Sequence, residues 1–83
     1  MPSEMLRRAD ALGYRALAIT DHADASNMAD LIEALWRVVR EQPHDFGTRL
    51  LVGVELTHVG PGSIARLARQ AKRLGAEVVV VHG

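Results

Sequence analysis

The sequence predicts an α/β protein in which short apolar strands alternate with amphipathic helices. Three apolar runs, at 14–20, 49–57 and 77–82, each follow a segment whose apolar residues recur at helical spacing. Strands that are apolar along their whole length are typical of parallel sheets covered by helices. Right-handed crossovers place the carboxyl ends of such strands on one side. We therefore expect a helix–strand unit repeated three times around a parallel sheet.

The first unit is expected to be a helix followed by a buried strand. Ser3 is a plausible N-cap, and Gly13 stands where helices commonly end on a left-handed glycine. Residues 14–20 then supply the Ile, Leu and Tyr side chains of a strand, with Tyr14 in the core. A polar loop is expected at 21–27.

The second and third units are expected to repeat this pattern. A helix at 28–42, ended by Pro43, precedes the strand at 49–57. Ser63 is a plausible N-cap for a third helix, which leads to the strand at 77–82. The pattern Arg-x-Ala-x-x-Leu-Gly occurs in the first and the third helix, as expected when β/α units resemble one another.

Composition limits both the core and the classes of function. A chain of 83 residues forms one small domain at most, which hides only about 60% of its unfolded surface. Ten basic residues balance ten acidic ones, which argues against nucleic-acid and membrane-surface partners. The apolar runs are too short to span a bilayer, so a cytoplasmic protein is expected. Cysteine is absent, so a metal site would need His, Asp or Glu.

Side chains that can bind a metal stand near the end of each predicted strand. Asp21 and His22 follow the first strand. Glu55 lies late in the second strand, and His82 ends the third. We expect them to converge, because the active sites of parallel β/α folds lie at this edge. Histidine and carboxylate ligands without cysteine suit Zn²⁺, Mn²⁺ or Fe in an open catalytic site.

Each of these residues also has a structural interpretation. A histidine at a strand end is often a hydrogen-bonded loop residue. Glu55 lies in an otherwise apolar strand, where a carboxylate must be paired, and a salt bridge with an arginine would serve as well as a metal. Gly53, two residues earlier, removes a side chain from the same face and leaves room for a neighbour.

Two further residues are candidates for substrate binding at the same edge. His58 follows the second strand, and Ser63 opens the next helix after a Gly-Pro-Gly turn. A helix N-terminus preceded by glycines is a reasonable phosphate-binding element. The alternative for His58 is an ordinary surface-loop histidine.

Three segments together resemble the PHP family, named for polymerase and histidinol phosphatase. ADALGYRALAITDHADASN is similar to its motif ending in Thr-Asp-His, LLVGVELTHV to its Gly-x-Glu strand, and VVVVHG to its later strand with a histidine ligand. The resemblance implies a distorted, TIM-like β/α barrel with two or three divalent metals. It also implies hydrolysis of phosphate monoesters by a metal-activated hydroxide.

The resemblance also implies roles for individual residues. Glu55 would bridge two metals, His82 would bind one of that pair, and His22 would bind the remaining metal. Asp21 would orient an imidazole or a metal-bound water, so Glu55 and Asp21 are the catalytic candidates. The family's opening His-x-His strand and its later ligands are absent. We therefore expect 1–83 to be a partial PHP-like domain, inactive or weakly active alone, that needs the remainder of the barrel or a second copy.

Two other hypotheses stay open. The first is a non-catalytic truncated or engineered β/α fragment that self-associates through its exposed sheet edges. The second is a small flavodoxin-like binding domain in which Asp21 and Glu55 form an acidic metal pocket. Histidines at strand ends count against the second hypothesis, since such pockets rarely use them.

Overall fold

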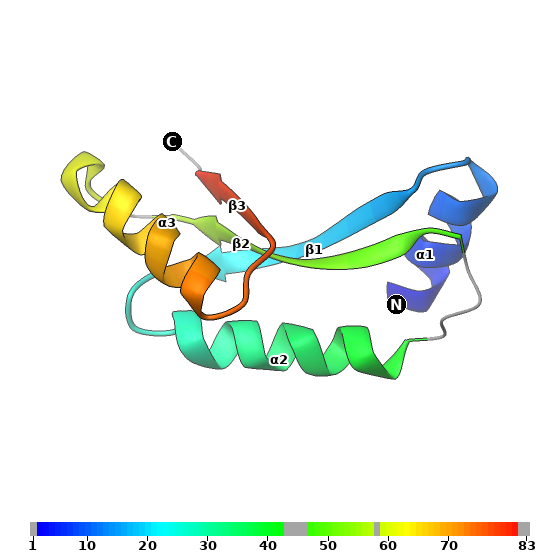
Figure 1. Cartoon of the computed structure of the whole chain (residues 1–83), viewed down its shortest axis with the longest axis horizontal. Coiled ribbons are helices and arrows are strands. Elements are labelled where there is room, and N and C mark those ends of the chain that lie inside the picture. Colours follow the sequence, from blue (N-terminus) through cyan, green and yellow to red (C-terminus); the bar gives the residue numbers. More distant parts are fainter. Residues whose placement is uncertain (1, 43–46, 58, 82–83) are drawn as a thin grey trace.

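The computed structural model describes residues 2–42, 47–57 and 59–81, and it has the predicted α/β class. The elements in chain order are α1 (Pro2–Ala11), β1 (Ala16–Ala23), α2 (Met28–Glu41), β2 (Arg49–Leu56), the 3-10 turn η1 (Pro61–Ser63), α3 (Ile64–Arg73) and β3 (Val78–Val81) (Figure 1). The strands form one parallel sheet, as predicted, and their order in it is β1-β2-β3. None of the described helices is long and apolar enough to cross a membrane.

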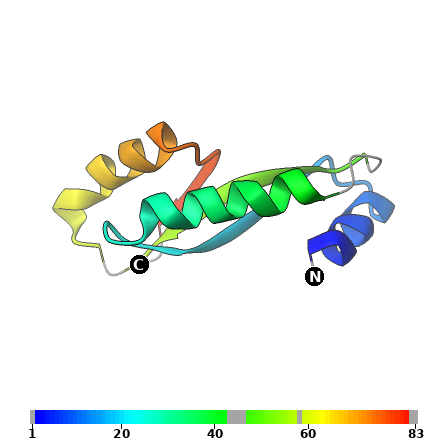
Figure 2. The same ribbon diagram turned by 90° about the horizontal axis from the view of Figure 1, so that it is seen from below.

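One face of the sheet carries the core. Val52, Val54 and Leu56 alternate along β2 and are at most 1% exposed. They pack in one cluster with Ile32 of α2 and Leu67 of α3. Both crossover helices therefore cover the same face (Figure 2). This is expected, because each new strand is added on the same side of the previous one and each crossover is right-handed. Burying each of these side chains stabilises the fold by about 1.5–3 kcal/mol.

The opposite face is left open by α2 and α3. Ala18 of β1 is exposed, Leu51 of β2 is half-buried, and Val80 of β3 is 42% exposed. Gly53 lies between its neighbours on this face, and a Cβ added there would stand 2.7 Å from Thr20 Cγ2 and 3.2 Å from Val78 Cβ. The space predicted beside Gly53 is thus occupied by the Thr20 and Val78 side chains.

α1 and α3 end on the same hydrogen-bonded cap. Gly13 and Gly75 both have positive φ, +85° and +112°. In each cap the glycine N–H donates to the carbonyl three residues earlier, and the next N–H donates to the carbonyl five residues earlier. This is the Schellman arrangement, which satisfies carbonyls that the helix leaves without partners. The Arg-x-Ala-x-x-Leu-Gly pattern shared by the two helices therefore encodes the same helix end twice.

The structure corrects three of the predicted boundaries. β1 begins at Ala16, which leaves Tyr14 outside the strand and 61% exposed, so its predicted place in the core is wrong. β1 also continues through Asp21 and His22 to Ala23, because those residues keep pairing with β2. They are strand residues and not part of the predicted loop. α1 begins at Pro2, so Ser3 lies inside the helix and its predicted N-cap position is wrong.

Candidate functional site

The carboxyl ends of β1 and β2 bring His22 and Glu55 together. The two residues are direct partners in the parallel register. His22 Nδ1 lies 3.7 Å from Glu55 Oε2. The His22 side chain is 64% exposed and that of Glu55 is 23% exposed. An imidazole and a half-buried carboxylate therefore face each other at the edge where the sequence places a site.

The alternation of each strand puts this pair on the open face of the sheet. Val54 and Leu56 flank Glu55 and are buried in the core, so Glu55 itself faces the other side. Ala23, next to His22, is 1% exposed, and His22 likewise faces away from the core. The pair thus lies clear of the helices, with Thr20 and Gly53, two register positions earlier, as the preceding pair on the same face.

Asp21 acts on the backbone beside His22. Its Oδ1 accepts a hydrogen bond from the His22 N–H at 2.7 Å. Its register partner is Val54, whose side chain is in the core, so Asp21 and Glu55 belong to opposite faces of the sheet. The expected convergence of both carboxylates is therefore wrong in this conformation.

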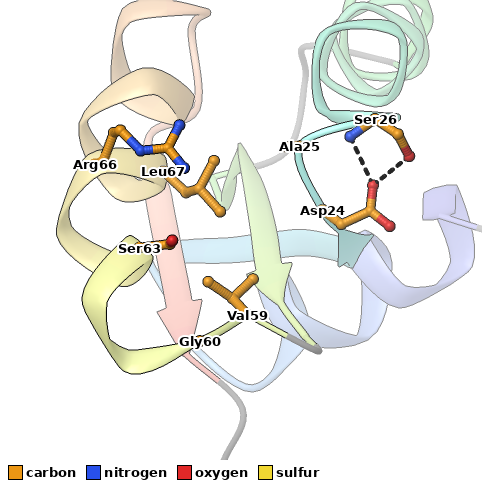
Figure 3. Close-up of a pocket in the computed structure, with 8 residues that line it drawn as sticks. All are labelled: Asp24, Ala25, Ser26, Val59, Gly60, Ser63, Arg66 and Leu67. Carbon is orange, nitrogen blue, oxygen red and sulfur yellow. Dashed lines mark hydrogen bonds between the residues drawn. The ribbon is translucent and has the colours of Figure 1, made fainter.

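The loop after β1 is held by a compact hydrogen-bond network that sequence reasoning missed. Asp24 Oδ1 accepts from the Ser26 N–H at 2.8 Å, the Ser26 hydroxyl at 2.6 Å and the Asn27 N–H at 3.2 Å (Figure 3). Asn27 Oδ1 accepts from the Asp24 N–H at 2.8 Å, and Asn27 Nδ2 donates to the His22 carbonyl at 3.4 Å. An Asp three residues before Asn and ahead of an apolar helix is the sequence signal of such a turn. The network ties the start of α2 to His22.

A pocket of about 350 Å³ lies between this loop and the start of α3. Its lining residues come from both connections and from the first turns of α3: Asp24, Ala25, Ser26, Val59, Gly60, Ser63, Arg66 and Leu67 (Figure 3). Ser63 is the N-cap residue of α3 but makes no side-chain cap hydrogen bond. Figure 3 shows its hydroxyl and the Arg66 guanidinium directed into the pocket. Arg66 was not among the predicted site residues.

His58 and His82 lie outside the described residues, so their predicted roles stay predictions. Within residues 2–42, 47–57 and 59–81, no three His, Asp or Glu side chains are grouped so as to hold a metal. The predicted alternative for Glu55, a salt bridge with an arginine, is not found in that part of the chain. Glu55 pairs with His22, and Arg49 Nη2 instead lies 2.6 Å from Glu77 Oε2.

The His22–Glu55 pair fits two of the ligands of a divalent cation. Two ligand atoms about 2.1 Å from a tetrahedral metal lie about 3.4 Å apart. The observed separation of 3.7 Å between Nδ1 and Oε2 is close to that value. Mixed nitrogen and oxygen ligands suit Zn²⁺, Mn²⁺ or Fe²⁺ better than Mg²⁺ or Ca²⁺. Two ligands alone bind weakly, so a stable site needs further donors.

Comparison with known proteins finds a clear relative. The chain is 51% identical over 85 residues to the uncharacterized protein MJ1295 of Methanocaldococcus jannaschii. The similarity covers the whole of this chain and 38% of the relative, so the chain spans well under half of that protein's length. No family model matches the chain. No solved structure matches it either.

Proposed function

We propose that this chain is an internal segment of a metal-dependent phosphoesterase of the PHP type, with His22, Glu55 and His82 among the metal ligands. The observation that carries the proposal is the 3.7 Å approach of His22 Nδ1 to Glu55 Oε2 at the carboxyl edge of a parallel sheet. The three motifs of the resemblance stand in the same order as strands β1, β2 and β3. The activity belongs to the complete domain.

The one-sided packing supports a barrel segment. α2 and α3 cover one face of a sheet whose strands follow each other in chain order. In a β/α barrel the helices lie outside and the opposite face, with its Ala, Leu and Val side chains, lines the packed interior. A flavodoxin-like sheet has the strand order 2-1-3 at its start and helices on both faces, so this arrangement argues against that hypothesis.

Each of the proposed site residues would have a distinct role. His22 and Glu55, with His82, would hold the cation. A divalent cation there supplies Lewis-acid activation of water and neutralises charge on a phosphate ester. Asp21 holds the backbone N–H of His22 and so helps to orient the ligand strand. Ser63 and Arg66 would bind phosphate oxygens in the adjoining pocket, since guanidinium groups pair well with phosphate.

Metal analysis of single variants tests the proposal. We expect the purified chain to bind Zn²⁺, Mn²⁺ or Fe²⁺, measured by titration and elemental analysis. His22→Ala and Glu55→Gln should each weaken metal binding by roughly 10- to 100-fold or more. Removing a group that only orients a metal ligand already costs that much affinity. Glu33→Gln, on the exposed side of α2, is the matched control and should bind as the parent does. A chain that binds none of these metals, with a stability that chelators leave unchanged, would contradict the proposed site.

A second candidate is a non-catalytic segment that self-associates, and exposed apolar side chains on an edge strand favour it. Val80 and Val81 of β3 are 42% and 48% exposed. β1 and β3 are the edges of the described sheet, and unpaired edges of this kind invite pairing with another chain. In this case the metal titration would show no binding and the chain would form oligomers.

A further inference from the structure

The outer side of α3 concentrates positive charge that the neutral whole-chain balance hides. α3 carries Arg66, Arg69, Lys72 and Arg73 and no acidic residue, against ten basic and ten acidic residues in the whole chain. The rest of the chain thus has six basic residues and ten acidic ones. We infer that this basic side of α3 is a docking surface for a polyanionic strand, a single-stranded nucleic acid.

Packing leaves the four cations on the solvent side of the helix. Leu67 is 3% exposed and Ala71 is 0% exposed, so the apolar side of α3 is buried against the sheet. The four basic residues are all exposed. Arg66, Arg69 and Arg73 follow each other at spacings of three and four, which places them in one row along the helix. Like charges at these spacings repel, so the row is unfavourable until an anion neutralises it.

The guanidinium groups of this row are available to an external anion. The salt bridges within the described part of the chain join His22 to Glu55, Arg37 to Glu33 and Arg49 to Glu77, and none involves α3. Lys72 Nζ donates to the Glu77 carbonyl at 3.0 Å, which leaves its charge without a carboxylate. The row therefore presents positive charge that the described residues do not balance.

Two hollows border the row. Arg66 lines the 350 Å³ pocket at the carboxyl edge of the sheet. Arg69, Lys72 and Arg73 line a second hollow of about 390 Å³ with Ala68 and with Val79 of β3. Cations around an apolar floor can pair with phosphates while sugars or bases lie over the aliphatic groups.

The length and character of the row favour a nucleic-acid strand over a membrane. Arg66 and Arg73 lie about 10 Å apart along the helix axis, at 1.5 Å per residue. A basic row of this length can follow a short stretch of the backbone of one strand. A helix that binds at a bilayer surface inserts its apolar side, whereas the apolar side of α3 is occupied by the core.

Fluorescence anisotropy with a labelled single-stranded oligothymidylate tests the inference on the 83-residue chain. Chelator is present throughout, so the outcome does not depend on the proposed metal ligands. We expect binding that weakens as salt rises. In Arg69→Gln/Arg73→Gln the slope of log K against log salt should fall by about 1.4, and affinity near 0.1 M salt should fall roughly 25-fold.

The matched control removes the same charge elsewhere. Arg7→Gln/Arg8→Gln changes two exposed cations of α1, and it should bind as the parent chain does. Circular dichroism checks that both variants keep their helix content. Equal weakening by both pairs would show only a general charge effect and overturn the inference. Absence of binding at low salt, or competition for the oligonucleotide by phosphatidylserine vesicles but not by vesicles of phosphatidylcholine alone, would overturn it too.

Discussion

At the scale of single residues, Glu55 shows how a carboxylate is kept in an apolar strand. Its neighbours Val54 and Leu56 are buried in the core, yet alternation directs Glu55 to the open face, where it is 23% exposed. The carboxylate therefore escapes most of the cost of burial and meets the imidazole of His22. Because the pair is partly solvated, the contact contributes less than about 1 kcal/mol to stability.

Gly53 lies two register positions before this pair, on the same face of the sheet. Gly53→Ala would place a methyl group 2.7 Å from Thr20 Cγ2 and 3.2 Å from Val78 Cβ. We expect a loss of about 1–3 kcal/mol in the free energy of unfolding, as is usual for overpacking. Urea denaturation measures it. Thr20→Ser removes the contacting methyl group, so the double variant should recover part of the loss. If the two effects simply add, the clash is not the cause.

At the scale of elements, the repeated helix end explains why α1 and α3 stop where they do. Both end on a glycine with positive φ that closes the same pair of hydrogen bonds. Their surroundings differ. Gly13 has no atom within 4 Å of an added Cβ, whereas at Gly75 the Trp36 Nε1 would stand 3.0 Å away. Trp36 Nε1 also donates to the Gly75 carbonyl at 2.8 Å, which fastens α2 to the end of α3.

This difference makes the two glycines a matched pair for mutation. Gly13→Ala should destabilise the chain by about 1–2 kcal/mol, the cost of a side chain in the left-handed region. Gly75→Ala should cost more, because the same strain is joined by a close contact that disturbs the Trp36 hydrogen bond. Thermal unfolding measures both losses, and only Gly75→Ala should shift the tryptophan fluorescence of the native state. Equal losses and unchanged emission would contradict this account.

At the scale of the whole molecule, the described chain is elongated and one-sided. Its extents are 40 × 22 × 19 Å, and its radius of gyration is 13.5 Å. A compact domain of this length would have a radius of gyration of about 12 Å. α1 lies at the amino end of β1, far from α3 (Figure 1), and α2 and α3 cover only one face of the sheet. The other face and both sheet edges stay accessible to further protein.

We expect this accessibility to cause self-association of the 83-residue chain. Static light scattering at increasing concentration should show a mass that rises above that of the 9.1 kDa monomer. Val80→Lys should lower the mass, because a lysine on an edge strand disfavours pairing with another chain. Leu12→Lys is the control, since Leu12 is 74% exposed and follows the end of α1, outside the strands. A monomer at every concentration would argue against the self-associating alternative.

Local chemistry allowed much of the fold to be predicted. The α/β class, the alternation of helices and strands and the helix ends at Gly13 and Gly75 follow from apolar periodicity and from the backbone freedom of glycine. These signals involve only a few neighbouring residues, so they can be recognised without knowing which elements pack together. That Asp21 and His22 belong to strand β1 was harder to predict from the sequence. A strand ends where its neighbour stops pairing, and residues distant in sequence decide that.

The sequence by itself therefore determined which elements form and which edge of the sheet collects His22 and Glu55. Only the tertiary structure decided how far β1 extends, which face each side chain takes and that Asp21 turns from Glu55 to the backbone of His22. The physical reason is register. In a strand, a shift of one residue moves a side chain to the other face, and the pairing with β2 sets that register. The 3.7 Å contact between His22 and Glu55 is the product of that pairing.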